Sequence, residues 1–294
     1  MAEPVPPVLR HIAALRSLTE YPSANKEWSL ERKLEAIKEA GFDGFTALLT
    51  PEHERCARKF DLMPIGYFSS GTRGEFKPLL EQNRAAGARH IHVQLGDHDT
   101  STKEALKLLK RLLSLAERID VKLAVEVQRD TCTETPEKTF ALADAFQKAT
   151  GQLLPFAWDF SHFAVMKQLS PPYWNRLGAR PDLIQRSQQF HFRPFNGHHC
   201  QVPVTGKSGQ LTPEANDFLS FVEKVFECWL EVASPGHEIF AVAEMGPLRC
   251  GFNLHGLPNS WEEAVVLASE IGECWRRAIR RWKPPASSAS AGVA

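Results

Sequence analysis

Leu123-Ala124-Val125-Glu126 is a short apolar run that ends in a carboxylate, and the chain repeats this pattern three more times. The other three runs are Phe156-Ala157-Trp158-Asp159, Gln189-Phe190-His191 and Phe240-Ala241-Val242-Ala243-Glu244. Short apolar runs separated by helix-length segments are typical of buried parallel strands. Because each run ends in a carboxylate or an imidazole, we expect polar groups to gather where these strands end.

Strands and helices alternate outward from these runs. Amphipathic or capped segments predict helices over 30–40, 76–86, 102–118, 136–150, 213–232 and 261–282, with a less regular stretch over 171–180. Ser29 and Gly41 are the expected cap and stop of the first helix. Eight strand–helix units indicate a (β/α)₈ TIM barrel, a single α/β domain over residues 1–283. Residues 284–294, rich in Pro, Ser and Ala, are expected to be a disordered tail.

The composition narrows the class of protein. Lys plus Arg and Asp plus Glu both number 35, so the formal net charge is zero and no basic excess points to nucleic acid. No apolar stretch is long enough to span a membrane, and residues 1–7 lack the features of a signal peptide. The six cysteines form no CxxC pair, which favours reduced thiols and a cytoplasmic protein.

In a (β/α)₈ barrel, the carboxyl ends of the strands converge on the face that carries the active site. Glu126, Asp159, His191 and Glu244 would therefore meet there as an oxygen-rich site for a divalent metal. Any one of them alone has an ordinary alternative, such as a salt bridge or a structural histidine. Three carboxylates and one imidazole suit Mn²⁺ best, with Mg²⁺, Co²⁺ or Zn²⁺ as alternatives.

Two further polar residues follow the metal strands. Alternation along the strand places Arg193 on the same face as His191. There it can hold a substrate carboxylate or hydroxyls, or can bridge to Asp159 or Glu244. His162, three residues after Asp159, can fold back toward the same cavity.

His92 and Gln94 share one face near the end of the strand over 90–95. They can contact substrate, extend the site to a second metal, or be polar groups satisfied inside the barrel. His198 and His199 lie on the loop after the strand of His191, and the sequence assigns them no role.

These motifs together resemble the xylose isomerase-like TIM barrel superfamily, in its sugar phosphate isomerase/epimerase group. The resemblance rests on Ala-Val-Glu-Val-Gln-Arg around Glu126, Trp-Asp-Phe-Ser-His from Trp158 to His162, Phe-His-Phe-Arg around His191 and Val-Ala-Glu-Met-Gly around Glu244. It covers nearly the whole chain short of the tail. Relatives include ketose 3-epimerases, inosose dehydratases and hydroxypyruvate isomerases.

The resemblance implies roles for particular residues. Glu126, Asp159, His191 and Glu244 would bind the metal, and Glu126 and Glu244 would also act as catalytic acid and base. His162 would bind substrate, and a homodimer is expected by the same likeness. Two departures stand against a ketose 3-epimerase: Cys132 replaces a further Glu, and Gly197 replaces an Arg.

The sequence therefore predicts a divalent-metal-dependent isomerase or epimerase that removes a proton next to a carbonyl. Its substrate would be a sugar, a sugar phosphate or a related keto acid. A lyase or dehydratase for sugars or inososes on the same barrel is the main alternative. A DNA repair nuclease similar to endonuclease IV, or a sugar-binding barrel without catalysis, fits the charge and the ligand set less well.

Overall fold

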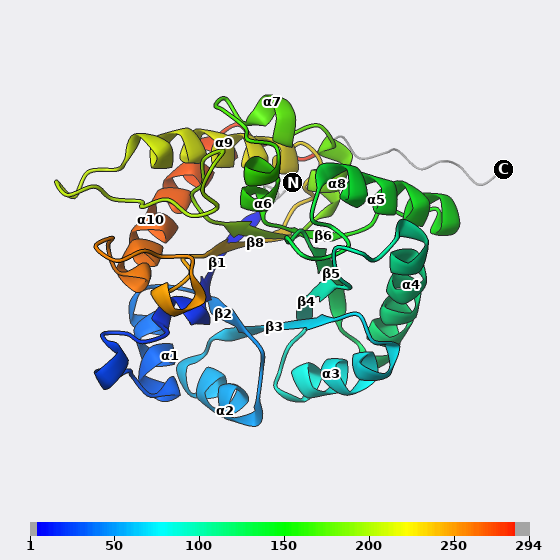
Figure 1. Ribbon diagram of the computed structural model, residues 1–294, viewed down its shortest axis with the longest axis horizontal. Helices are drawn as coiled ribbons and strands as arrows, with labels where there is room; N and C mark the ends of the chain where they lie inside the picture. Colours follow the sequence, from blue (N-terminus) through cyan, green and yellow to red (C-terminus); the bar gives the residue numbers. More distant parts are fainter. Residues whose placement is uncertain (1–4, 286–294) are drawn as a thin grey trace.

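The computed structural model describes residues 5–285 of the 294, which form a closed barrel of eight parallel strands. The strands pair in chain order, and β1 closes the ring against β8, with Ile12 beside Val242. Helices surround the strands as an outer layer (Figure 1). The predicted single (β/α)₈ barrel is confirmed. Most of the tail expected over 284–294 lies outside the described residues.

The strands are β1 (Val8–Ala14), β2 (Gly44–Ala47), β3 (Met63–Ser70), β4 (His90–Leu95), β5 (Lys122–Glu126), β6 (Phe156–Trp158), β7 (Gln189–Phe192) and β8 (Glu238–Ala243). The α-helices are α1 (Leu30–Glu39), α2 (Pro51–Phe60), α3 (Arg73–Ala85), α4 (Thr102–Ile119), α5 (Pro136–Thr150), α6 (Phe160–Met166), α7 (Trp174–Leu177), α8 (Pro181–Arg186), α9 (Pro213–Leu230) and α10 (Ser260–Ile279). Short 3₁₀ turns are η1 (Leu15–Leu18), η2 (Ala24–Lys26) and η3 (Leu248–Cys250).

The predicted ends of α1 are confirmed. The Ser29 hydroxyl accepts a hydrogen bond from the backbone N–H of Arg32, which satisfies a donor that the first turn leaves free. Gly41 follows the helix with φ of +83°, a conformation that glycine adopts without steric cost. The segment therefore begins and ends where its sequence provides these two residues.

Alternation along the strands divides the core into two parts. Residues that point outward pack under the helices in one continuous apolar cluster. Inside the barrel, a small apolar cluster contains Ile12, Ala14, Ile65, Phe240 and Val242, which come from β1, β3 and β8. The inward positions of β4, β5 and β7 instead carry His92, Glu126, Gln189 and His191, all of them buried. The interior is thus apolar on one side and polar on the other.

The segment after β6 differs from the expectation. Asp159 follows the strand as the N-cap of α6, and its carboxylate accepts from the backbone N–H of Ser161 at 3.0 Å. His162 therefore lies in the first turn of a helix rather than in an open turn. The stretch over 171–180 contains α7, and α8 was not predicted, because helices of four to six residues are too short to show a 3.6-residue period.

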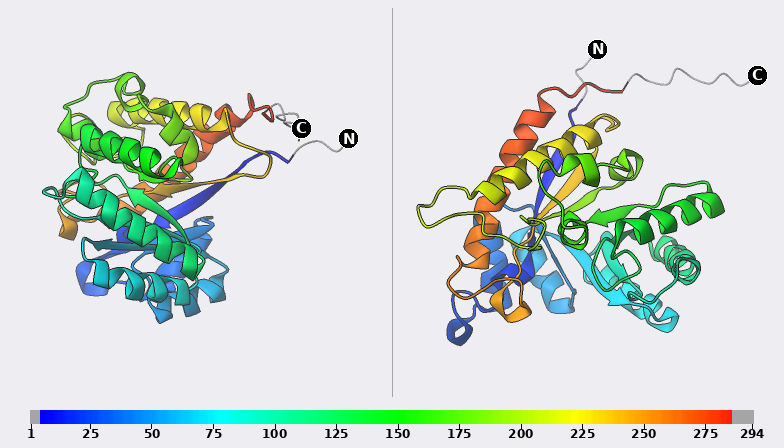
Figure 2. Two further views of the ribbon diagram at one scale, coloured as in Figure 1. Left: turned by 90° about the vertical axis from the view of Figure 1, so that its right-hand side faces the viewer. Right: turned by 45° about the horizontal axis from the view of Figure 1, so that its top comes forward.

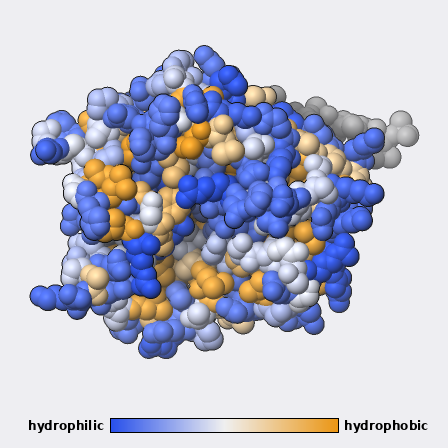
Figure 3. All heavy atoms as spheres, viewed as in Figure 1, coloured by the Kyte–Doolittle hydropathy of each residue, from blue (hydrophilic) through white to orange (hydrophobic). Residues whose placement is uncertain are grey.

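The last two long helices, α9 and α10, lie side by side against the barrel (Figure 2). Phe226 and Trp275 meet edge to face across them, with ring centroids 5.2 Å apart. Apolar side chains on the face shown in Figure 3 are dispersed in small groups among hydrophilic ones. Among residues 5–285, no helix has the length and apolar character needed to cross a membrane.

Ser187 joins the start of β6 to the segment before β7. Its buried hydroxyl accepts from the N–H of Phe156 at 3.1 Å and from Trp158 Nε1 at 3.0 Å, and donates to the carbonyl of Leu183 at 2.8 Å. Ser187→Ala leaves two buried donors without an acceptor, so we predict a loss of about 1–3 kcal/mol in the free energy of unfolding.

Urea denaturation followed by circular dichroism measures this loss. The control is Ser220→Ala, at an exposed position of α9 where the hydroxyl donates only to the carbonyl of Asn216. That change should stay within about 0.5 kcal/mol of the unaltered protein. Equal stability of the two variants would show that Ser187 does not join these segments.

Candidate active site

A cavity of about 560 Å³ opens at the carboxyl ends of the strands. Its volume lies within the range of about 300–1,000 Å³ that small-molecule sites occupy. The polar groups at its deep end are Arg16, Tyr67, His92, Gln94, Glu126, His191 and Glu244. Leu15, Leu30, Ala47, Leu48 and Thr50 are among the residues of its outer wall. The polar residues lie on β3, β4, β5 and β7 or directly after β1 and β8, so barrel closure brings them together.

His92, Glu126 and His191 form a compact buried group at the deep end of this cavity. One potential ligand atom from each lies within 4.8 Å of those of the other two. His92 Nε2 is 3.6 Å from one oxygen of Glu126, and His191 Nδ1 is 3.9 Å from the other. The two imidazole rings meet edge to face, 4.7 Å apart. Two imidazoles and a carboxylate at this spacing can hold a divalent transition metal.

Glu126 is the one carboxylate of the site that no arginine contacts among the described residues. Its Oε2 accepts a hydrogen bond from Gln94 Nε2 at 3.1 Å, and Tyr67 donates to Gln94 Oε1 at 3.1 Å. Burial raises the pKa of Glu126 to about 7, although His191 acts in the opposite direction. This carboxyl group can therefore gain and lose a proton near neutral pH.

Arg193 holds the other two carboxylates. Its side chain is only 1% exposed, its Nη2 donates to Asp159, and the same nitrogen lies 3.3 Å from Glu244 Oε1. Burial opposes ionisation of Asp159, but the charge of Arg193 and the neighbouring His162 lower its pKa. The bridge to Asp159 and Glu244 is one of the two arrangements that the sequence allowed for Arg193.

A second arginine, Arg16 in the turn η1 after β1, contacts Glu244 at 2.9 Å, and His191 Nδ1 lies 2.7 Å from the other oxygen of Glu244. Burial would raise the pKa of Glu244, but Arg16, Arg193 and His191 outweigh it and hold that pKa well below its usual value. The ring of Phe252 covers the guanidinium groups of Arg16 and Arg193, with centroid distances of 4.6 and 4.4 Å. In this arrangement Glu244 is thus held in its ionised form.

The predicted residues fall into two sets. His92, Gln94, Glu126, His191 and Glu244 line the cavity. Asp159, His162 and Arg193 are buried beside it and are not among its lining residues, with His162 Nε2 3.2 Å from Asp159 Oδ2. His198 and His199 are exposed on their loop, where their backbone N–H groups donate to the side chain of Asn196.

Sequence reasoning missed Arg16, Tyr67, Gln189 and Phe252. Gln189 had a usable signal, because it lies two residues before the inward-facing His191 on the same strand. Arg16 had none, because it lies in the 3₁₀ turn after β1, where this alternation does not apply. Tyr67 belongs to the inward side of β3, with Ile65. Phe252 lies in an irregular loop between η3 and α10, and nothing in its local sequence indicates that it covers two arginines.

The donor set shows which residues fit a divalent metal. Asp159 and Glu244 already share the charge of Arg193, and Glu244 also that of Arg16. Glu126 has no such partner, and its raised pKa reflects a buried carboxylate that a nearby cation would stabilise. His92, Glu126 and His191 therefore fit a metal ion once His191 Nδ1, which lies 2.7 Å from Glu244, gives up its proton. The four-residue set implied by the resemblance requires Arg193 to release two carboxylates first.

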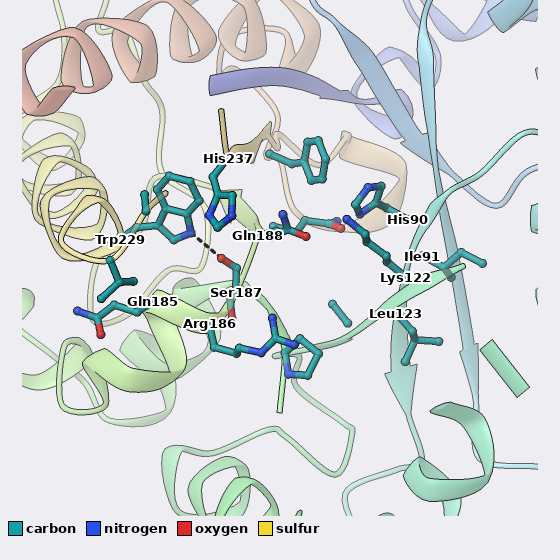
Figure 4. A pocket seen from close by; sticks show the side chains of 16 residues that line it. His90, Ile91, Lys122, Leu123, Gln185, Arg186, Ser187, Gln188, Trp229 and His237 are labelled. Carbon is teal, nitrogen blue, oxygen red and sulfur yellow. Dashed lines mark hydrogen bonds between the residues drawn. The ribbon is translucent and has the colours of Figure 1, made fainter. Parts of the chain in front are cut away.

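A second cavity, of about 570 Å³, lies at the opposite end of the barrel, where the strands begin (Figure 4). Gln185, Arg186 and Trp229 line one side of it, and His90 and Lys122 the other. Its lining contains no Asp or Glu, so it offers no carboxylate for acid–base work. The candidate active site is therefore the cavity at the carboxyl ends.

No family model matches the sequence, and no curated protein matches it either. Solved structures do match in fold. A D-allulose 3-epimerase from Methylomonas sp. superposes with a TM-score of 0.56 at 15% identity, over 95% of this chain and 100% of that one. A sugar phosphate isomerase/epimerase from Parabacteroides distasonis gives 0.57 at 13% identity, over 93% and 96%.

A third match is a xylose isomerase-like TIM barrel protein from Mycobacterium smegmatis in complex with magnesium. Its TM-score is 0.54 at 13% identity, over 92% of this chain and 97% of that one. The superpositions cover these proteins almost completely, and at identities this low they establish a shared fold alone. The chain has the fold of the xylose isomerase-like barrels, as its motifs indicated.

Proposed function

We propose that the protein is a divalent-metal-dependent isomerase or epimerase that moves a proton next to the carbonyl of a sugar or related keto compound. The observation that carries this proposal is the buried carboxyl of Glu126 at the deep end of the cavity, beside His92 and His191. A carboxylate close to the reacting carbon can act as the general base. The fold shared with sugar epimerases supports the same chemistry.

His92, Glu126 and His191 would hold the metal ion. When bound, such an ion polarises a carbonyl oxygen and so makes the neighbouring C–H more acidic. The donor set of two imidazoles and one carboxylate accepts Mn²⁺ and Co²⁺ as well as Zn²⁺, whereas Mg²⁺ prefers more oxygen ligands. The set implied by the resemblance, Glu126, Asp159, His191 and Glu244, is the competing proposal.

Other residues of the cavity orient Glu126 or provide a second carboxylate. Gln94, held by Tyr67, fixes the position of the Glu126 carboxylate from which the proton moves. Glu244 lines the same cavity and stays ionised, so it is the second catalytic candidate and can accept a proton only when Arg16 or Arg193 moves away.

The sequence predicted four residues as substrate contacts, namely His92, Gln94, His162 and Arg193. In the present arrangement His92 and Gln94 line the cavity and can contact a substrate, whereas the Phe252 ring covers Arg193.

A lyase shares the first step, because loss of water next to a carbonyl also begins with removal of a proton. The two reactions are separated by the product: an isomerase returns a compound of equal mass, and a dehydratase returns one lighter by a water molecule. The three-metal cluster of a nuclease is not supported, because the described residues contain a single group of three or more close His, Cys, Asp or Glu.

The first prediction concerns acid–base catalysis. Glu126→Gln keeps the size of the side chain and its contact with Gln94, but removes the proton acceptor. We expect turnover on a panel of ketoses, inositol ketones and keto acids to fall by about 10²–10⁴-fold, with the thermal melt of the barrel retained. Glu104→Gln, at an exposed position in the first turn of α4, is the control and should keep full turnover. Activity within a few-fold of wild type in Glu126→Gln would end its assignment as the base.

The second prediction decides between the two metal sets by calorimetric titration with Mn²⁺. His191→Ala and Glu126→Gln should each lower Mn²⁺ affinity by at least about tenfold, since even the outer partners of metal ligands are worth about 10–100-fold. The double variant Asp159→Asn with Arg193→Gln removes both members of a buried ion pair and should leave Mn²⁺ affinity unchanged. A loss in the double variant as large as that in His191→Ala would favour the four-residue set.

A further prediction is that the enzyme loses activity on treatment with a chelator and regains it with Mn²⁺ or Co²⁺. The physical reason is that a bound divalent ion supplies the positive charge that polarises the carbonyl. Elemental analysis of the treated protein provides the control. Full turnover in protein shown to be free of metal would refute metal dependence.

A further inference from the structure

Gln189 contacts both histidines of the candidate metal group, although no motif pointed to it. It is the first residue of β7, two before His191, and its side chain is 3% exposed. Its amide nitrogen lies 2.8 Å from His92 Nδ1 and 2.8 Å from His191 Nε2. One side-chain amide therefore joins the outer nitrogens of two imidazoles that come from strands on different sides of the barrel interior.

The inner nitrogens of the same two rings face the carboxylates. His92 Nε2 faces Glu126, and His191 Nδ1 lies 2.7 Å from Glu244. A neutral imidazole carries its proton on only one of its two nitrogens, so whatever the outer nitrogen does decides what the inner nitrogen can do. The partner of the outer nitrogens thus controls the atoms that a metal ion would use.

The two orientations of the Gln189 amide have opposite consequences. With the NH₂ group toward the rings, both outer nitrogens must accept, and each neutral ring carries its proton on the inner nitrogen. A half-turn of the amide places its oxygen at almost the same position. Both outer nitrogens then donate to that oxygen, and the inner nitrogens present lone pairs to the space beside Glu126.

We propose that Gln189 is a positioning residue that sets the tautomers of His92 and His191, with its amide oxygen accepting both outer N–H groups when a divalent ion is bound. The inference rests on the proposed metal group. Metal-bound histidines usually donate their second N–H to an acceptor that fixes ring orientation. Here a single buried amide provides that acceptor for both rings. The tautomer of one histidine is therefore coupled to the tautomer of the other.

The Gln189 side chain has open space on one side, because it borders the cavity at the amino end of the barrel. The exchange of NH₂ and oxygen needs no displacement of the backbone of β7. Metal-free and metal-loaded protein can therefore differ in the orientation of this amide and share the same fold.

Metal affinity tests the proposal without any need for a substrate. Gln189→Met keeps the length of the side chain and removes the acceptor, and we expect it to lower affinity for Zn²⁺ and Mn²⁺ by about 10–100-fold. Gln189→Glu keeps an acceptor for both N–H groups and should bind at least as tightly as wild type. Gln188→Met is the matched control, since Gln188 faces the amino-end cavity and contacts only the carbonyl of Glu238; its affinity should be unchanged.

Nitrogen-15 NMR of the wild-type protein loaded with diamagnetic Zn²⁺ reads the tautomers directly. The proposal predicts protons on His92 Nδ1 and His191 Nε2, and metal at His92 Nε2 and His191 Nδ1. Bare outer nitrogens in the loaded protein, or unchanged Zn²⁺ affinity in a folded Gln189→Met, would overturn the role of Gln189 while leaving the metal site in place. Absence of any Zn²⁺ binding to wild type would remove the site and this inference with it.

Discussion

Charge compensation in a buried space is the constraint on which the rest of this site depends. Glu126, Asp159 and Glu244 are brought within one barrel mouth by the ends of β5, β6 and β8, and each is at most 4% exposed. Three buried carboxylates cannot all stay ionised without cations nearby. Arg193 and Arg16 neutralise Asp159 and Glu244. Glu126 has no arginine partner among the described residues, and burial raises its pKa. This difference from Asp159 and Glu244 makes Glu126 the carboxyl group of the site that a bound cation would stabilise most.

The barrel scaffold creates this asymmetry through alternation along its strands. The inward positions of β1, β3 and β8 include Ile12, Ile65 and Phe240, which pack together as an apolar cluster inside the barrel. Those of β4, β5 and β7 are polar much deeper in the barrel, down to Gln189. The polar groups of the candidate active site therefore gather on one side of the barrel interior, opposite this apolar cluster.

The sequence predicted the strands and most of the polar groups of the site, because the fold repeats one local pattern, a short apolar strand that ends in a polar residue. Apolar runs ending in Glu126, His191 and Glu244 predicted the strands, their shared face and the gathering of these groups. The two arginines show where the reasoning stopped: Arg193 was placed on the correct face, but its choice between substrate and carboxylates depends on distances between strands. Arg16 approaches Glu244 only because β1 closes the barrel against β8, and no spacing along the chain encodes that contact. The contact of Gln189 with His92, 97 residues away in the chain, likewise depends on the folded barrel.

The central claim is that this site removes a proton from a carbon next to a carbonyl. Incubation of the metal-loaded protein with candidate ketoses and keto acids in D₂O, followed by NMR of the recovered compounds, tests it most directly. The account predicts deuterium at the carbon adjacent to the carbonyl of the true substrate, and its disappearance in Glu126→Gln. Conversion of a substrate with no deuterium at that carbon, and with no slowing when that carbon carries deuterium from the start, would contradict proton removal there and with it the role given to Glu126.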